Sequence, residues 1–173
     1  KKKLGIRDKD VVLLSVGELN DNKNHRVIIR ALGDIKRENA INLREIKYLI
    51  CGQGEQFQDL KKLVEQEKLE DQVQLLGFRT DMADIYKMAN IFVFPSFREG
   101  LSVALMEAMW CGLPVICSRI RGNIDLVDKR GGIMFDASNV LEAKNAIMKM
   151  IKMDTEKRNR MGIYNKKKIK NFS

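Results

Sequence analysis

Short apolar runs alternate with longer amphipathic segments along the whole chain. The short runs are rich in valine, isoleucine and leucine and are bounded by glycine or polar residues, which is typical of buried parallel strands. They occupy 11–17, 46–51, 73–78, 91–94, 115–117 and 131–135. Between them, apolar residues recur every three or four positions, as on the buried face of a helix. Helices are therefore predicted at 24–38, 55–68 and 154–170, from 81, 102 and 138 onward, and as a short turn after Gly122.

The alternation of strands and helices requires crossover connections between parallel strands. We therefore predict an α/β fold, a Rossmann-like three-layer αβα sandwich with a mainly parallel sheet of about six strands. The 173 residues are expected to form one domain, 1–173, which ends in a basic helix and tail at 153–173. Ligands of such sheets bind beyond the carboxyl ends of the strands. The loops expected to converge there begin at Gly17, Gly52, Phe78 and Pro95.

Four helices begin at residues whose side chains often cap helix starts. Polar oxygens at this position accept hydrogen bonds from the first free backbone N–H groups. The residues in question are Asn24, Asp81, Ser102 and Ser138.

The segment from Phe94 to Ser118 contains the main candidate chemistry. It reads as a buried strand, an exposed loop, a helix, a tight turn and a second buried strand. Glu107 is the only charged residue between Gly100 and Cys117, so we expect its carboxylate to be buried and to need a partner. Glu99 lies on the loop before the helix. The amides of Gly100, Leu101 and Ser102 would form a helix N-terminus that binds anions, and Gly100 would let the backbone approach a ligand closely.

The spacing of Glu99 and Glu107 suits a nucleotide sugar. If the helix starts at Ser102, Glu107 lies about 7–8 Å further along its axis. The diphosphate would take the amides, and the carboxylates would accept hydrogen bonds from sugar hydroxyls on either side. The alternative is that Glu107 pairs with a core arginine and Glu99 is solvated. The spacing of the apolar residues does not distinguish the nucleotide-sugar site from this alternative. An ordinary buried helix face is predicted in either case, at Leu101, Ala104, Leu105, Ala108 and Met109.

The same segment resembles the E-x7-E motif of retaining glycosyltransferases of the two-Rossmann-domain (GT-B) type, family 4, also called glycosyl transferases group 1. The family form is roughly PSxxEGxxxxxxEAxxxGxPVIxS. The matching positions are Pro95, Ser96, Glu99, Gly100, Glu107, Ala108, Gly112, Pro114, Val115, Ile116 and Ser118. The resemblance extends over about 11–173. It implies that the chain is the C-terminal, donor-binding half of a GT-B fold without its N-terminal acceptor domain, and that this half alone is inactive.

The resemblance also implies roles for these residues. Glu99, with the backbone of Gly100 to Ser102, would position the donor sugar, and Glu107 would hold the ribose hydroxyls. Lys23 and the helix N-terminus would stabilise charge on the leaving diphosphate, so Glu99 and Lys23 are the catalytic candidates. The family needs no bound metal and no cofactor besides its nucleotide-diphosphate sugar, which the resemblance implies is a UDP-sugar, and the sequence shows no cluster of metal ligands.

The first loop departs from the family form GRLxxxKG or KN. Gly17 and Lys23 match, but Glu18 stands where the family usually has arginine. A glutamate beside a diphosphate would repel it, so Glu18 turns away, is charge-paired or marks a chain that has lost activity. Some family members resemble GELNxNKNH here, which favours a working variant. Gly17 and Glu18 are therefore retained as donor-binding candidates.

The second and third loops supply weaker candidates. Gln53 lies in a family-like GxG, which a tight turn explains equally well. Phe78 and Arg79 would hold the nucleobase, Arg79 by stacking on the ring. The alternative for Arg79 is a surface ion pair with Asp81 or Asp84. Two further features supply no site residue: Gly122 to Asp125 departs from the family's GGxPE, and the sole histidine, His25, reads as a helix-start residue.

Charge is concentrated at the two ends of the chain. Of the net charge of +9, residues 1–9 contribute +4 and residues 157–173 contribute +7, which leaves −2 for 10–156. A nearly neutral body argues against nucleic acid as a partner. The basic end is either a solvated helix or a contact with an anionic membrane surface. Its apolar residues are Ile163, Tyr164, Ile169 and Phe172.

The remaining expectations concern location and function class. The sequence shows neither a membrane span nor a secretory leader, and its three cysteines read as reduced and mostly buried, so we expect a cytoplasmic protein, peripheral at most on the inner membrane face. The implied activity is hexosyl transfer to a saccharide or lipid-linked acceptor in polysaccharide or glycolipid synthesis. The alternatives are a sugar-nucleotide epimerase of the same architecture and a non-catalytic nucleotide-binding or scaffold module.

Overall fold

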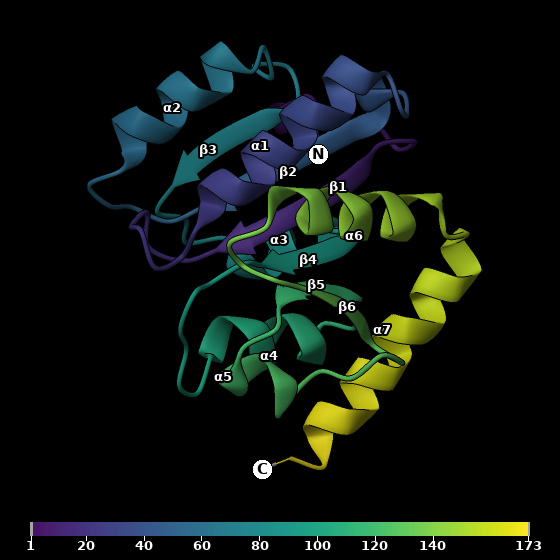
Figure 1. Cartoon of the computed structure of the whole chain (residues 1–173). Coiled ribbons are helices and arrows are strands. Elements are labelled where there is room, and N and C mark those ends of the chain that lie inside the picture. The colour runs from purple at the N-terminus through teal and green to yellow at the C-terminus, as the bar shows by residue number, and fades with distance from the viewer. Residues whose placement is uncertain (1, 173) are drawn as a thin grey trace.

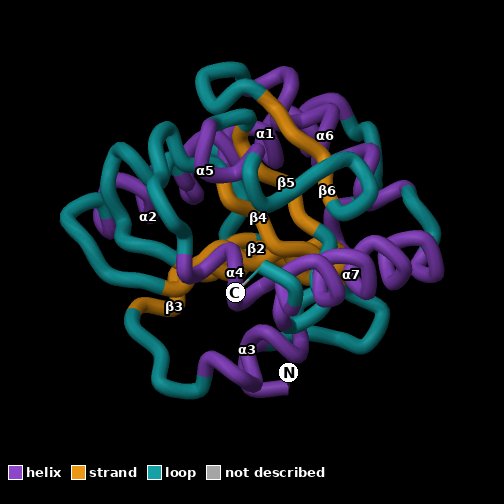
Figure 2. Tube along the Cα trace, turned by 90° about the horizontal axis from the view of Figure 1, so that it is seen from below, coloured by secondary structure: helices purple, strands orange, loops and turns teal. Residues whose placement is uncertain are grey.

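Six parallel strands form one sheet, and a computed structural model describes residues 2–172 of the chain (Figure 1). The strands lie in the order β3-β2-β1-β4-β5-β6, so β3 and β6 are the two edges (Figure 2). They are β1 Val11–Val16, β2 Ile46–Cys51, β3 Val73–Gly77, β4 Ile91–Phe94, β5 Val115–Ser118 and β6 Gly132–Phe135. Each predicted strand is present, with bounds that differ from the prediction by one residue at most. The predicted α/β sandwich is confirmed.

Helices cover both faces of this sheet (Figure 1). Helices α1, α2 and α6 pack on one face, and α3 and α4 pack on the other. Helix α7 contributes Met161 to the first core and Ile169 to the second. The α-helices are α1 His25–Glu38, α2 Phe57–Gln66, α3 Met82–Met88, α4 Val103–Trp110, α5 Arg121–Ile124, α6 Val140–Lys152 and α7 Thr155–Lys170. Short 3-10 turns occur at Lys2–Leu4 and Leu43–Glu45.

Alternation along the buried strands builds two cores. On β1, Leu13 faces the α1 side, while Val12 and Leu14 face the α4 side, and all three are fully buried. Strand β1 lies between β2 and β4, so the chain order reverses at the carboxyl ends of β1 and β4. A crevice at this switch point is where ligands of such sheets bind.

One of the four predicted capping side chains accepts a hydrogen bond from its helix. Ser102 Oγ accepts a hydrogen bond from Leu105 N at 3.1 Å, so the predicted start of α4 is confirmed. Asn24 precedes α1 but does not cap it, because its backbone is left-handed (φ 60°) and its side-chain amide binds other loops. Asp81 precedes α3, but its carboxylate is bound to Arg79 instead.

The start predicted at Ser138 is also wrong. Helix α6 begins one residue later, where Asn139 Oδ1 accepts from Glu142 N at 3.0 Å. The Ser138 hydroxyl donates instead to Asp136 Oδ1 at 2.8 Å. The two cap candidates are adjacent in sequence, and the turn at Asp136 selects between them.

Membrane-spanning segments and cysteines were the subject of two further predictions. Among residues 2–172, no helix combines the length and apolar composition needed to cross a membrane. Cys51 and Cys117 are buried free thiols, whereas Cys111 is exposed. Of the predicted domain 1–173, only Lys1 and Ser173 lie outside the described residues.

Candidate functional site

The first two loops are joined backbone to backbone. Gly17 N donates to Cys51 O at 3.0 Å, and Leu19 N donates to Gln53 O at 2.9 Å. A Cβ on Gly52, whose φ is +146°, would lie 2.0 Å from Gly17 O. Glycine is therefore required where the second loop meets the first, which gives the GxG a structural role besides any ligand contact.

Lys23 and Glu99 form an ion pair at the centre of the converging loops. Lys23 Nζ lies 2.6 Å from Glu99 Oε2, and the two side chains are 23% and 11% exposed. The Lys23 ammonium also lies 5.5 Å from the centre of the Phe94 ring, a cation–π contact. Glu99 is therefore not a solvated side chain, and the structure brings the two predicted catalytic candidates into contact.

Two asparagines fasten the first loop to the loop after β4. Asn22 Oδ1 accepts from Arg98 N at 3.0 Å, and Asn22 Nδ2 donates to Arg98 O at 2.9 Å. Asn24 Nδ2 donates to Pro95 O at 3.0 Å and to Ala137 O at 2.9 Å. Sequence reasoning missed both as positioning residues. Their signal is their place on either side of Lys23, in a loop that must hold its shape.

The Glu99 loop rests on Gly122 of helix α5, which follows β5. A Cβ on Gly122 would lie 2.5 Å from Gly100 O and 2.6 Å from Glu99 O. Gly100 itself is exposed, and no atom lies within 4 Å of its own hypothetical Cβ. The space above Gly100 is therefore open. No site residue was predicted in the segment that begins at Gly122. In the structure, Gly122 sets the position of the loop that carries Glu99.

The start of α4 presents free backbone donors. Within residues 2–172, the N–H groups of Gly100, Leu101 and Ser102 donate no hydrogen bond to the protein. Leu101 is 71% exposed, which contradicts its predicted place in the core stripe. Because these amides lie at the positive end of α4, they can bind an anion.

Glu107 is exposed rather than buried, which corrects the prediction. No ion pair involves it within residues 2–172, so no core arginine neutralises it. It shares an outward face of α4 with Val103 (63% exposed) and Trp110 (53% exposed), at helical spacing. The pKa of Tyr86 on α3 is raised by burial and then by the Glu107 charge, so Glu107 lies beside α3.

Glu18 is exposed and accepts a hydrogen bond from the Asn20 side chain within its own loop. It forms no ion pair within residues 2–172, so the charge-paired alternative does not hold. The carbonyl of Glu18 lies 3.2 Å from Nε2 of the buried His25 ring. Burial lowers the pKa of His25 to about 4, so its ring is neutral at physiological pH and anchors the start of α1.

The two candidates of the third loop take no part in the Lys23–Glu99 ion pair. Phe78 is 70% exposed. Arg79 binds Asp81 through two hydrogen bonds, of 2.9 and 2.8 Å, which is the surface pairing given as its alternative role. The Asp81 hydrogen bonds raise the pKa of Arg79, and Arg79 lowers that of Asp81. Gln53 is exposed on the neighbouring loop, and within residues 2–172 no hydrogen bond or ion pair joins these three side chains to Lys23.

The family model described as glycosyl transferases group 1 matches residues 1–168. The chain belongs to this family. It is 33% identical over 149 residues to an Escherichia coli UDP-Gal:alpha-D-GlcNAc-diphosphoundecaprenol alpha-1,3-galactosyltransferase, a match that covers 85% of this chain and 38% of that enzyme. It is 34% identical over 110 residues to a Campylobacter jejuni diphospho-undecaprenol N-acetylgalactosaminyltransferase, covering 64% and 28% of the two chains. The group 1 chain thus spans well under half of these relatives' lengths.

Solved structures agree on the fold. The crystal structure of Anabaena HepE in complex with UDP-glucose superposes with a TM-score of 0.86 at 23% identity, over 98% of this chain and 46% of that one. This likeness confirms that the group 1 chain has the fold of a glycosyltransferase domain, as the sequence motif implied.

The candidate site consists mainly of charged side chains and free backbone N–H groups. Among residues 2–172, no three His, Cys, Asp or Glu side chains come together as metal ligands. A cavity of about 330 Å³ opens beside the first loop, between Asp21, Arg26, Arg30 and Phe97. Two larger cavities, of about 580 and 570 Å³, are lined by residues other than Lys23 and Glu99.

Proposed function

We propose that this group 1 chain is the donor-binding domain of a glycosyltransferase that uses a nucleotide-diphosphate sugar, with UDP as the nucleotide. The observation that carries the proposal is the ion pair of Lys23 and Glu99, 2.6 Å apart, at the switch point of the sheet and beside the free amides of α4. The E. coli relative is named for UDP-Gal, and HepE was solved with UDP-glucose, which supports UDP over other nucleotides.

Each group has a distinct task in this proposal. The diphosphate takes the N–H groups of Gly100 to Ser102 and the Lys23 ammonium, which together stabilise negative charge as the sugar leaves. Glu99 accepts hydrogen bonds from the sugar hydroxyls, and the exposed carboxylate of Glu107 is available to the ribose. Donor binding therefore replaces the Lys23–Glu99 contact with two contacts to the ligand. Retention of configuration is taken from the family resemblance.

The acceptor side belongs to the rest of the enzyme. The relatives are more than twice as long as the stretch they share with this chain, so we propose that an N-terminal acceptor domain completes the cleft. This domain alone would then bind donor without turning it over. Both relatives are named for undecaprenyl-diphosphate acceptors, which supports a lipid-linked saccharide acceptor and work at the cytoplasmic membrane face. The family match does not favour the epimerase alternative.

Titration calorimetry tests the proposal directly. UDP-galactose and UDP-glucose should bind the chain with about millimolar affinity or better, and GDP-mannose more weakly. Lys23→Ala should weaken binding roughly 10- to 150-fold, because a charge-assisted contact to phosphate contributes roughly 1.5–3 kcal/mol. Lys61→Ala on the exposed face of α2 is the matched control and should change nothing.

Two outcomes would contradict the proposal. No binding of any nucleotide sugar at millimolar concentration would indicate the scaffold alternative. A loss of binding on adding a chelator would show that a metal supplies the positive charge here assigned to Lys23 and the α4 amides.

A further inference from the structure

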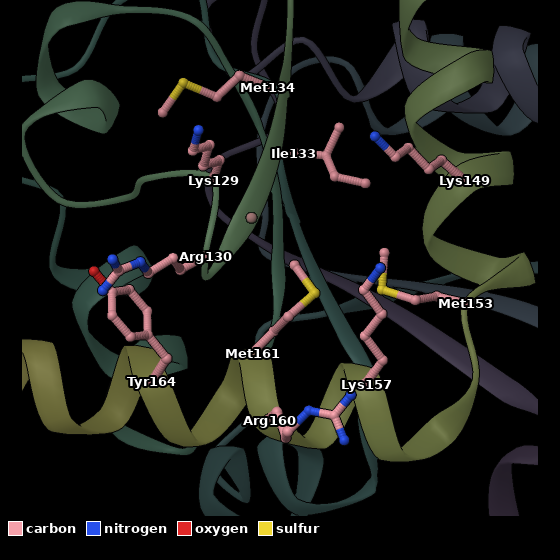
Figure 3. Close-up of a pocket in the computed structure, with 11 residues that line it drawn as sticks. Lys129, Arg130, Ile133, Met134, Lys149, Met153, Lys157, Arg160, Met161 and Tyr164 are labelled. Atoms are coloured by element: carbon pink, nitrogen blue, oxygen red, sulfur yellow. The ribbon is translucent and has the colours of Figure 1, made fainter.

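A groove of about 570 Å³ lies at the free edge of the sheet, far along the chain from Lys23 (Figure 3). Strand β6 forms one wall, the last turn of α6 a second, and the first half of α7 the third. The wall residues of β6 start at Gly132, the amino end of the strand. The donor site proposed above lies at the carboxyl ends of the strands, so the groove is a separate feature.

The floor of the groove is apolar and adaptable. Ile133 and Met134 come from β6 and point to opposite sides of it, Met153 follows α6, and Met161 comes from α7 (Figure 3). The first three are only partly buried. Methionine side chains are flexible and polarizable, so such a floor fits an irregular apolar chain better than a rigid ring.

The rim of the groove is cationic on every side. Lys129 and Arg130 precede β6, Lys149 lies on α6, and Lys157 and Arg160 lie on α7 (Figure 3). No ion pair within residues 2–172 involves Lys129, Lys149 or Lys157.

The other two cations of the rim, Arg130 and Arg160, make only weak interactions with neighbouring side chains. Arg160 pairs with Glu156, but the two side chains are 64% and 84% exposed, so the pair is weak. Arg130 lies over the Tyr164 ring at 5.8 Å, which leaves its charge in place. The groove therefore concentrates positive potential above an apolar floor.

This geometry changes the picture of the basic C-terminal helix. Ile169 is buried in the core, and the Tyr164 hydroxyl donates to Asp128 at 2.6 Å, so neither is free to enter a membrane as the sequence suggested. Arg158 is also buried, and its guanidinium donates to the carbonyls of Met150 and Ile151. Ile163 and Phe172 stay exposed, at 55% and 45%, so the apolar surface beside the α7 cations consists of these two side chains and the groove floor.

We propose that this groove docks the protein on an anionic membrane, with a phospholipid headgroup at the cationic rim and the upper part of its chain on the methionine floor. Charge complementarity identifies the occupant, because a phosphate matches the rim and an acyl chain matches the floor. A peptide strand added to β6 fits less well. Strand β6 has four residues, and the N–H of Gly132 already donates to Asp128 O at 3.0 Å, so few main-chain groups remain for pairing.

Vesicle flotation tests the charge of the rim. The chain should bind phosphatidylcholine vesicles that contain about one third phosphatidylglycerol and should not bind pure phosphatidylcholine. The variant Lys149→Glu/Lys157→Glu should bind about thirtyfold more weakly, since each lysine close to an anionic surface contributes about fivefold. The control Lys61→Glu/Lys62→Glu on α2 makes the same change of net charge and should cost about threefold or less. Circular dichroism verifies that both variants fold.

A second measurement tests the floor. Met153→Trp in a Trp110→Phe background places the only tryptophan in the groove, and brominated anionic lipid should quench its fluorescence. Lys61→Trp in the same background is the control and should not be quenched.

Three results would overturn the proposal. They are an equal loss of vesicle binding in both charge-reversal variants, unquenched Met153→Trp on bound vesicles, and tighter binding to a soluble acidic peptide than to anionic vesicles. Because donor titration is independent of all three, failure of the docking groove and failure of the donor site are distinguishable.

Discussion

Lys23 Nζ lies 2.6 Å from Glu99 Oε2, although the two residues are 76 positions apart in sequence. Both side chains are largely buried, so each charge depends on the other for its partner. The pair holds the first loop against the loop that leads into α4. It also means that the cation proposed to bind phosphate and the acid proposed to bind sugar neutralise one another in this structure. A donor must compete with this contact, which makes the pair both a structural bond and a determinant of affinity.

A double-mutant cycle tests the ion pair as a structural bond. Lys23→Met and Glu99→Gln should each reduce the free energy of unfolding by about 1–2 kcal/mol, because each leaves one partly buried charge unpaired. The double variant should lose less than the sum, with a coupling of about 1 kcal/mol. Urea unfolding followed by circular dichroism measures all four proteins.

The exposed pair of Lys9 and Glu45, 3.8 Å apart, provides the control cycle. Its coupling should be close to zero, since ion pairs in water contribute little. Strict additivity at Lys23 and Glu99 would mean that their contact adds nothing to stability.

Much of this arrangement could be predicted from sequence. The strands were readable because parallel strands buried on both faces form continuous apolar runs, such as Ile46–Cys51, bounded by glycine or polar residues. The motif around Glu99 and the loop with Lys23 identified the family, and strand order then brings those loops together. Pairing of the two side chains did not follow from the pattern, because it depends on distances across the sheet.

Three errors have physical causes. Helix α4 is apolar on nearly every side, so periodicity did not reveal that Glu107 and Val103 face outward. Asn24 had the right chemistry to cap α1, but two carbonyls of other loops bind its amide instead. The support that Gly122 gives to the Glu99 loop is a contact between backbones, and such a contact leaves only a lone glycine in the sequence.

Two glycine substitutions should distinguish the effect of the Glu99 loop's position on donor binding from the effect of direct contact between Gly100 and the donor. Gly122→Ala should displace the Glu99 loop, because its Cβ would lie 2.5 Å from Gly100 O and cannot be accommodated by a side-chain shift. Donor affinity should fall about tenfold, with a loss of stability of about 1–3 kcal/mol from overpacking. Gly100→Ala has open space and should keep the stability, while weakening donor binding if ligand backbone contact occurs there. Calorimetry and urea unfolding measure both quantities. Normal donor binding by Gly122→Ala would show that the loop does not depend on this contact.

The single histidine should set an acid limit to stability. Burial lowers the pKa of His25 to about 4 from the ordinary 6.5, so the unfolded chain binds a proton that the folded chain refuses. The stabilisation is complete above pH 6.5 and is lost as the pH falls from there towards 4, with a total of about 3 kcal/mol. His25→Gln keeps an N–H donor for Glu18 O without titrating, so its stability should fall less steeply than that of the unchanged chain over this window. Urea unfolding at several pH values gives the two slopes, and equal slopes would assign the effect to other groups.

Phe78 provides a test of the nucleobase end of the site that stability does not confound. Its ring is 70% exposed at the end of β3, so Phe78→Ala should change the free energy of unfolding by less than about 0.5 kcal/mol. An aromatic ring that stacks on a base contributes about 1–3 kcal/mol, so UDP and UDP-sugars should bind the variant about five- to a hundredfold more weakly. Arg79→Ala is the informative comparison, because Arg79 is already bound to Asp81 through two hydrogen bonds. If the ion pair with Asp81 is the only role of Arg79, Arg79→Ala should bind UDP normally. If the guanidinium also stacks on the base, Arg79→Ala should bind UDP more weakly. Asp81→Ala should then weaken UDP binding too, because Asp81 holds the guanidinium in place. Unchanged UDP affinity in Phe78→Ala would show that Phe78 does not contact the nucleobase.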